Sequence, residues 1–79
     1  MVVKDIQELK ELAKDGREFQ ICLNGGLRSS KYINFDGVVF WIENYIDGSS
    51  DKYTEDELIA EDCPSNIGRA LKQQALITE

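Results

Sequence analysis

The stretch EFQICLNGG, residues 18–26, decides the fold. Its apolar side chains Phe19, Ile21 and Leu23 alternate with polar or smaller ones, which is the period of a β-strand with one buried face. The stretch ends in Asn24-Gly25-Gly26, and a tight hairpin turn requires residues that accept a positive φ. We therefore expect a strand that turns back antiparallel onto the segment that follows it.

Two further strands are expected after this turn. The second spans residues 27–35, and Asp36-Gly37 then signals another hairpin. The third spans residues 38–46, and its first half, residues 38–42, is apolar on both sides. Such a strand needs cover on both faces of the sheet, from the chain's own helices or from another molecule. The centre of the chain is thus predicted to be a three-stranded antiparallel meander.

Helices are expected on both sides of the meander in the sequence. The first spans residues 6–14, because its apolar side chains recur at helical spacing. Asp5 is a suitable N-cap for it, and Asp15-Gly16 ends it, since glycine tolerates a positive φ. After the meander, the capping box Thr54-Glu55-Asp56-Glu57 opens a short helix that continues through Ala60.

A last helix is expected near the C-terminal end of the sequence. Pro64 interrupts the chain, and Ser65 or Asn66 can cap a helix over about residues 67–74. Leu76-Ile77 is then expected to extend along a sheet edge. These elements predict an α+β fold with an N-terminal helix, a three-stranded antiparallel meander and two short C-terminal helices around a single core.

Length and composition agree with one small folded domain over residues 1–79. The chain is 42% hydrophobic and 30% charged, as in ordinary globular proteins. Its longest apolar run is far shorter than the roughly 20 residues that cross a membrane, and its first residues lack the apolar region of a signal peptide. We therefore expect a cytoplasmic protein without a membrane partner.

Charge is unevenly distributed along the chain. Residues 36–62, here called the acidic segment, contain nine acidic side chains and one basic one, Lys52, whereas the net charge of the whole chain is −6. The other residues therefore carry a small positive balance. A local negative field attracts cationic partners and repels nucleic acid.

The leading hypothesis is a non-enzymatic binding module that recognises a protein through this acidic segment. A suitable partner is basic, such as a nucleic-acid-binding host protein whose DNA the carboxylates would mimic. The candidate partner-binding residues are Glu43, Asp47, Asp51, Glu55, Asp56, Glu57, Glu61 and Asp62.

Two alternatives remain open. Arg28, Lys31 and Tyr32 of the predicted hairpin offer cations for phosphates and an aromatic ring for base stacking, so they are the candidate contacts for an anion or nucleic acid. Trp41 is interpreted as a core residue. The doubly apolar strand at residues 38–42 could instead lie in a homodimer interface, so the chain is expected to be a monomer or a homodimer.

Catalysis and metal binding are disfavoured by what the sequence lacks. It contains no histidine and no known catalytic motif, so we expect neither enzyme activity nor a cofactor. Residues 47–51 place oxygen side chains at alternating positions as a calcium loop does, but Lys52 replaces the required glycine and Leu58 the bidentate glutamate. We interpret them as a solvated turn and expect no metal site. Cys22 and Cys63 are interpreted as free thiols.

Four segments carry a resemblance: LNGGLRSSKYI (residues 23–33), FWI (40–42), TEDEL (54–58) and SNIGRAL (65–71). In this order they resemble segments of small uncharacterised proteins of bacterial prophages and mobile elements. The resemblance implies an accessory gene in a bacterial or phage genome, a setting in which small proteins often bind host proteins. It implies no activity and assigns no functional residue.

Overall fold

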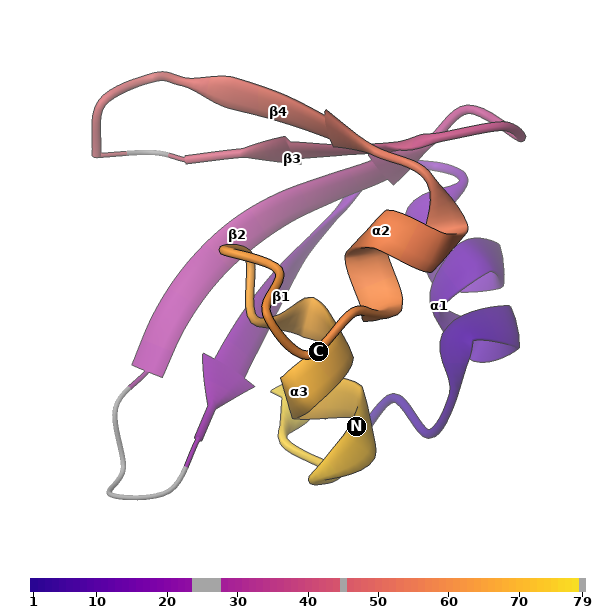
Figure 1. Cartoon of the computed structure of the whole chain (residues 1–79), viewed down its shortest axis with the longest axis vertical. Coiled ribbons are helices and arrows are strands. Elements are labelled where there is room, and N and C mark those ends of the chain that lie inside the picture. The colour runs from indigo at the N-terminus through magenta and orange to yellow at the C-terminus, as the bar shows by residue number, and fades with distance from the viewer. Residues whose placement is uncertain (24–27, 45, 79) are drawn as a thin grey trace.

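The structure, a computed structural model, describes residues 1–23, 28–44 and 46–78. These residues form three helices and an antiparallel five-stranded sheet, which confirms the α+β class (Figure 1). The elements in chain order are α1 (Ile6–Ala13), β1 (Arg17–Cys22), β2 (Arg28–Phe35), β3 (Phe40–Glu43), β4 (Ser50–Tyr53), α2 (Glu55–Ile59), α3 (Ile67–Lys72) and β5 (Leu76–Ile77).

The strands lie in the order β4-β3-β2-β1-β5, and each neighbouring pair is antiparallel. The predicted meander is present as β1, β2 and β3, and it is extended by β4 on one side and β5 on the other. Leu76-Ile77 pairs with β1, as expected, and Val2 forms a bridge to Ile77 beyond it. The predicted turn at Asn24–Gly26 lies outside the described residues.

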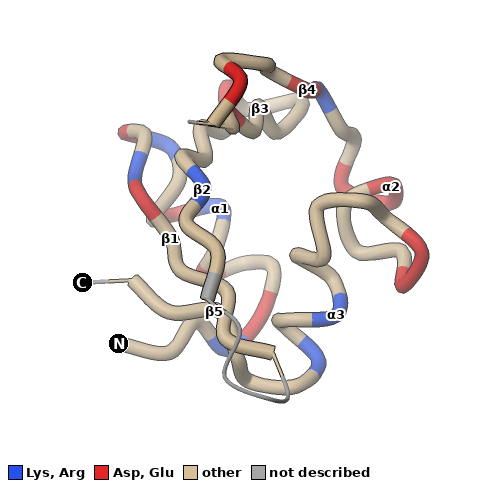
Figure 2. The backbone as a smooth tube through the Cα atoms, turned by 90° about the vertical axis from the view of Figure 1, so that its left-hand side faces the viewer, with Lys and Arg blue, Asp and Glu red and all other residues tan. Residues whose placement is uncertain are grey.

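The core lies on one face of the sheet. Phe19, Ile33 and Phe40 point to this face from three successive strands and are fully buried. Each helix adds a fully buried side chain to the same cluster: Leu9 from α1, Leu58 from α2 and Ile67 from α3. Figures 1 and 2 show the sheet curving around the three helices.

The opposite face of the sheet has no helix over it among the described residues. Strand pairing places Glu18, Tyr32 and Glu43 in one row across this face, and Asn34 and Trp41 in the next row. We call it the open face.

The helix signals in the sequence are largely confirmed. Asp5 caps α1, since its side chain accepts a hydrogen bond of 2.9 Å from the Glu8 N–H. Thr54 and Glu57 form the predicted capping box at the start of α2. Asn66 occupies the N-cap position of α3 without a side-chain cap bond, and the hydroxyl of Ser65 before it accepts a 3.3 Å hydrogen bond from the Ile67 N–H.

The third strand is shorter than expected. It spans Phe40–Glu43 instead of residues 38–46 because a turn borders it on each side. The carboxylate of Asp36 accepts hydrogen bonds from the N–H groups of Val38 and Val39, and Val38 is 77% exposed. Beyond Glu43, the Asn44 side chain accepts a bond from the Ile46 N–H, and Ile46 is 96% exposed. Of the doubly apolar stretch behind the homodimer hypothesis, only residues 40–42 therefore lie in a strand.

Strand β4 was not expected, because residues 47–51 were interpreted as a turn. Ser50–Tyr53 is polar and pairs with β3 along its full length, with Tyr53 opposite Phe40 and Ser50 opposite Glu43. As an edge strand exposed along most of its length, β4 buries too little side-chain surface to need alternating apolar residues.

The interpretation of Trp41 as a core residue was wrong. Phe40 and Ile42 point into the core, so Trp41 between them points to the open face and is 42% exposed. Its position follows from the strand period, and the three helices all cover the other face.

Two of the helices meet at a glycine. A β-carbon added to Gly68 of α3 would lie 2.4 Å from the carbonyl oxygen of Ile59 at the end of α2, so only glycine permits this approach.

Among the described residues, no helix is long and apolar enough to cross a membrane.

Candidate functional site

The eight acidic candidate residues follow the β3–β4 hairpin, α2 and the turn after α2. Figure 2 shows these acidic positions from the hairpin at the top of the view to α2 and the following turn at the right. All of them except Glu55 are exposed to solvent. The structure therefore leaves most of these eight carboxylates at the surface, on the hairpin, α2 and the turn after α2.

Tyr53, at the end of β4, lies where the hairpin and α2 meet. Burial raises the pKa of its phenol, and the negative charges of Asp51 and Glu57 raise it further. Asp51 lies two residues before Tyr53 on β4, and Thr54 alone separates Tyr53 from α2, which contacts β4. We call the carboxylates of β4, α2 and the turn after α2 the acidic surface: Asp51, Glu55, Asp56, Glu57, Glu61 and Asp62.

Glu43 and Asp47 lie apart from the acidic surface. Glu43 stands opposite Tyr32 on the open face, whereas Asp51 stands opposite Ile42 on the helix side. Asp47 lies in the hairpin turn, where its carboxylate accepts a 2.9 Å hydrogen bond from the Ser49 N–H. Hydrogen bonds from Ser49 hold the pKa of Asp47 below its ordinary value.

Two carboxylates of the acidic surface form ion pairs with lysines. Glu55 pairs with Lys10 of α1, whose ammonium also lies 5.8 Å from the centroid of the Phe35 ring. Glu61 pairs with Lys72 of α3, and this bond lowers the pKa of the carboxyl and raises that of the ammonium. These pairs join α2 and its following turn to the other two helices.

A third carboxylate of the acidic surface, that of Glu57, takes part in capping α2. Glu57 accepts a 2.9 Å hydrogen bond from the Thr54 N–H, and this bond holds the pKa of Glu57 below its ordinary value. Asp51, Asp56 and Asp62 are different, since they are exposed and make no hydrogen bond or ion pair with the described residues. They are the carboxylates of the acidic surface that no described cation or N–H group contacts.

The alternative set, Arg28, Lys31 and Tyr32, does not share one face of the sheet. Lys31 stands opposite Phe19 on the helix side, and Tyr32 stands opposite Glu18 on the open face. The backbone of Arg28 pairs with Cys22, and its side chain lies outside the described residues. A single flat ligand therefore cannot contact both Lys31 and Tyr32 from one side of the sheet.

Trp41, Asp36 and Lys52 form a surface cluster that the sequence did not predict. The indole N–H of Trp41 donates a 3.1 Å hydrogen bond to Asp36, and the Lys52 ammonium lies 5.8 Å from the centroid of the Trp41 ring. The N–H groups of Val39 and Val38, followed by the Trp41 indole, hold the pKa of Asp36 below its ordinary value. The alternation of Phe40, Trp41 and Ile42 is the signal that could have placed the ring outside the core.

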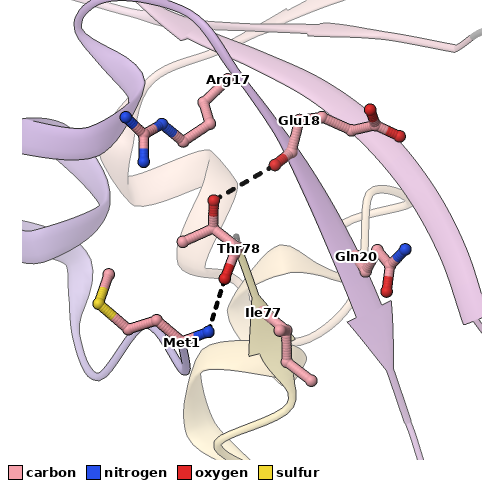
Figure 3. Close-up of a pocket in the computed structure, with 6 residues that line it drawn as sticks. All are labelled: Met1, Arg17, Glu18, Gln20, Ile77 and Thr78. Atoms are coloured by element: carbon pink, nitrogen blue, oxygen red, sulfur yellow. Dashed lines mark hydrogen bonds between the residues drawn. The ribbon is translucent and has the colours of Figure 1, made fainter.

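A hollow of about 500 Å³ lies where β1 meets β5 and the first residues of the chain (Figure 3). The α-amino group of Met1 donates a 2.6 Å hydrogen bond to the Thr78 carbonyl, and the Thr78 hydroxyl donates a 3.4 Å bond to the Glu18 carbonyl. The charged groups around it are of both signs, since Arg17 and Glu18 both line it. This hollow therefore shows no preference for one ligand charge.

The thiols are free, as expected. Cys22 is half-buried in β1, and Cys63 is buried with its Sγ 3.1 Å from the Ser65 Oγ. Residues 1–23, 28–44 and 46–78 contain no group of three or more His, Cys, Asp or Glu side chains that could hold a metal ion.

Comparisons with protein-family models, curated proteins and solved structures found no match to this chain.

Proposed function

We propose that this chain is a non-enzymatic protein-binding module, and that its acidic surface recognises a basic segment of a partner protein. The observation that carries the proposal is that β4 and α2 contact each other and that the carboxylates of β4, α2 and the turn after α2, except that of Glu55, are exposed. Carboxylates from separate elements thus converge on one exposed region. A cationic segment placed there interacts with several of them at once.

The unpaired carboxylates give the acidic surface its binding capacity. Asp51, Asp56 and Asp62 are exposed and form no ion pair with a lysine of the described structure, so their carboxylates are accessible to a partner. The paired residues Glu55 and Glu61 contribute differently, because their lysines fix the position of α2 and hold the surface in shape. Surface charges of this kind mainly accelerate and orient association, and salt weakens their effect.

We do not propose that the acidic surface imitates DNA. Duplex DNA carries one negative charge for about every 1.7 Å of its axis, without internal neutralisation. Here Glu55 and Glu61 are already paired with lysines, which dilutes the negative charge along the surface. A short basic segment fits this sparser arrangement better than a protein that grips a continuous duplex.

Affinity capture from a bacterial lysate tests the proposal. The variant D56N/D62N removes two exposed carboxylates without disturbing a cap or an ion pair of the described structure. The control variant E11Q/D15N removes the same charge from exposed positions on and just after α1. We expect a basic partner that the wild type and the control retain and that D56N/D62N loses. Equal retention by all three proteins would contradict the proposal.

A further inference from the structure

The open face carries a shallow hollow of about 380 Å³ that crosses three neighbouring strands. Its lining comes from β2, β3 and β4: Tyr32, Asn34, Trp41, Glu43 and Ser50. Strand pairing explains the grouping, since Tyr32, Glu43 and Ser50 lie in one row across the sheet. The hollow lies on the opposite face of the sheet from Asp51, so it is a separate place from the acidic surface.

The indole ring in this hollow is held in position. Trp41 donates its N–H to one carboxylate oxygen of Asp36, and the other oxygen accepts bonds of 2.8 and 2.9 Å from the N–H groups of Val38 and Val39. The ring is nevertheless 42% exposed. A ring that is fixed before binding loses little conformational freedom when a ligand stacks on it.

The charges around the hollow favour a cation. The carboxylate of Glu43 lines it, and Glu18 stands opposite Tyr32 in the neighbouring strand. Lys52 already places its ammonium 5.8 Å from the centroid of the Trp41 ring, within the range of a cation–π interaction, so a guanidinium that stacks on this ring must displace this ammonium. A phosphate would be repelled by the two carboxylates, so this face suits a cation better than a nucleic acid.

We propose that this hollow binds the guanidinium group of an arginine side chain, an inference that rests on the basic protein partner of the proposed function. A guanidinium is planar and weakly hydrated, so it stacks on an aromatic ring such as Trp41 and donates paired hydrogen bonds to a carboxylate such as Glu43. The amide oxygen of Asn34 and the hydroxyl of Ser50 can accept its remaining N–H groups. Lysine is a poorer match, because its compact ammonium cannot form the paired bonds.

Hexa-arginine and hexa-lysine peptides test the inference, since they have equal charge and differ in the cationic group. Trp41 is the chain's one tryptophan, so its fluorescence and its indole N–H resonance report on the hollow directly. At low salt we expect hexa-arginine to bind at least about threefold more tightly than hexa-lysine and to shift both Trp41 signals.

Two variants distinguish peptide binding at the hollow from peptide binding at the acidic surface. E43Q removes the carboxylate of the hollow from an exposed position, and we expect it to reduce the preference for arginine to near equality. D56N/D62N lies outside the hollow and should leave the Trp41 shifts and the preference for arginine unchanged. A thermal melt of each variant checks that it is folded.

The outcomes distinguish the two proposals. Equal affinity for the two peptides with unchanged Trp41 signals would overturn the arginine site and leave the acidic surface standing. Absence of binding by either peptide at low salt would contradict both proposals. A single-stranded oligothymidine that shifts the Trp41 signals as strongly as hexa-arginine would overturn the arginine site in favour of nucleic acid.

Discussion

The indole N–H of Trp41 and the carboxylate of Asp36 are joined by a 3.1 Å hydrogen bond across the turn between β2 and β3. The same carboxylate accepts hydrogen bonds from the N–H groups of Val38 and Val39. One side chain therefore shapes the turn and orients the exposed ring. This bond links a local turn to the surface that we assign to ligand binding.

Acid should release Trp41 from this arrangement. The hydrogen bonds lower the pKa of Asp36, so its ionised form is favoured in the folded protein. The stability that the carboxylate contributes is therefore present above its unfolded pKa, roughly 4, and is lost as the pH falls through the lower folded value. Trp41 fluorescence followed from pH 7 downward should change with a midpoint below the ordinary value for aspartate. A midpoint at or above that value would contradict the assignment.

The titration of Tyr53 tests the placement of Asp51 beside it on β4. Burial is the largest cause of its raised pKa, and the charges of Asp51 and Glu57 add to it. We expect D51N to lower the pKa of Tyr53 while leaving it above that of an exposed tyrosine. Carbon NMR of the tyrosine rings measures this, with E11Q as a control that should leave the Tyr53 titration unchanged. An unaltered pKa in D51N would contradict the placement of Asp51 and Tyr53 on the same face of β4.

Gly68→Ala should destabilise the fold by about 1–3 kcal/mol, because the added methyl group would overlap the backbone of Ile59. Denaturant unfolding measures the loss. Arg69→Ala on the same helix changes an exposed side chain and should alter the free energy of unfolding by less than about 0.5 kcal/mol. If the two variants are equally stable, α3 does not approach the end of α2 as closely as described.

Thr54→Ala should cost about 1 kcal/mol of stability, since the Glu57 N–H would lose the hydroxyl oxygen that accepts its hydrogen bond. Thr54→Ser keeps that oxygen and should restore most of the stability. Thermal unfolding of the two variants makes the comparison. A serine variant as unstable as the alanine variant would show that the hydroxyl is not what stabilises the start of α2.

The parts of the fold that the sequence predicted have local causes. Asp5 and Thr54 cap their helices through side chains three residues from the bonded N–H, so short sequence patterns were sufficient. The alternation of Phe19 and Ile21 likewise identified the buried face of β1. Strand β4 could not be recognised in this way, because its polar residues are placed by backbone pairing with β3.

The candidate site was predicted less completely, because it depends on which face each side chain occupies. The count of carboxylates suggested one surface, yet Glu43 lies on the open face and Asp51 on the helix side. The ion pairs of Glu55 and Glu61 join residues far apart in the sequence, and no local pattern reveals them. The opposite directions of Lys31 and Tyr32, in contrast, follow from the strand period alone.

The central claim is that the acidic surface binds a basic partner through charge. The most direct test is the dissociation constant of the captured partner, measured over a series of salt concentrations for the wild type, D56N/D62N and E11Q/D15N. We predict that salt weakens the wild type and the E11Q/D15N control equally and steeply, and that D56N/D62N binds more weakly with a shallower salt dependence. The same affinity and the same salt dependence in all three proteins would contradict the claim.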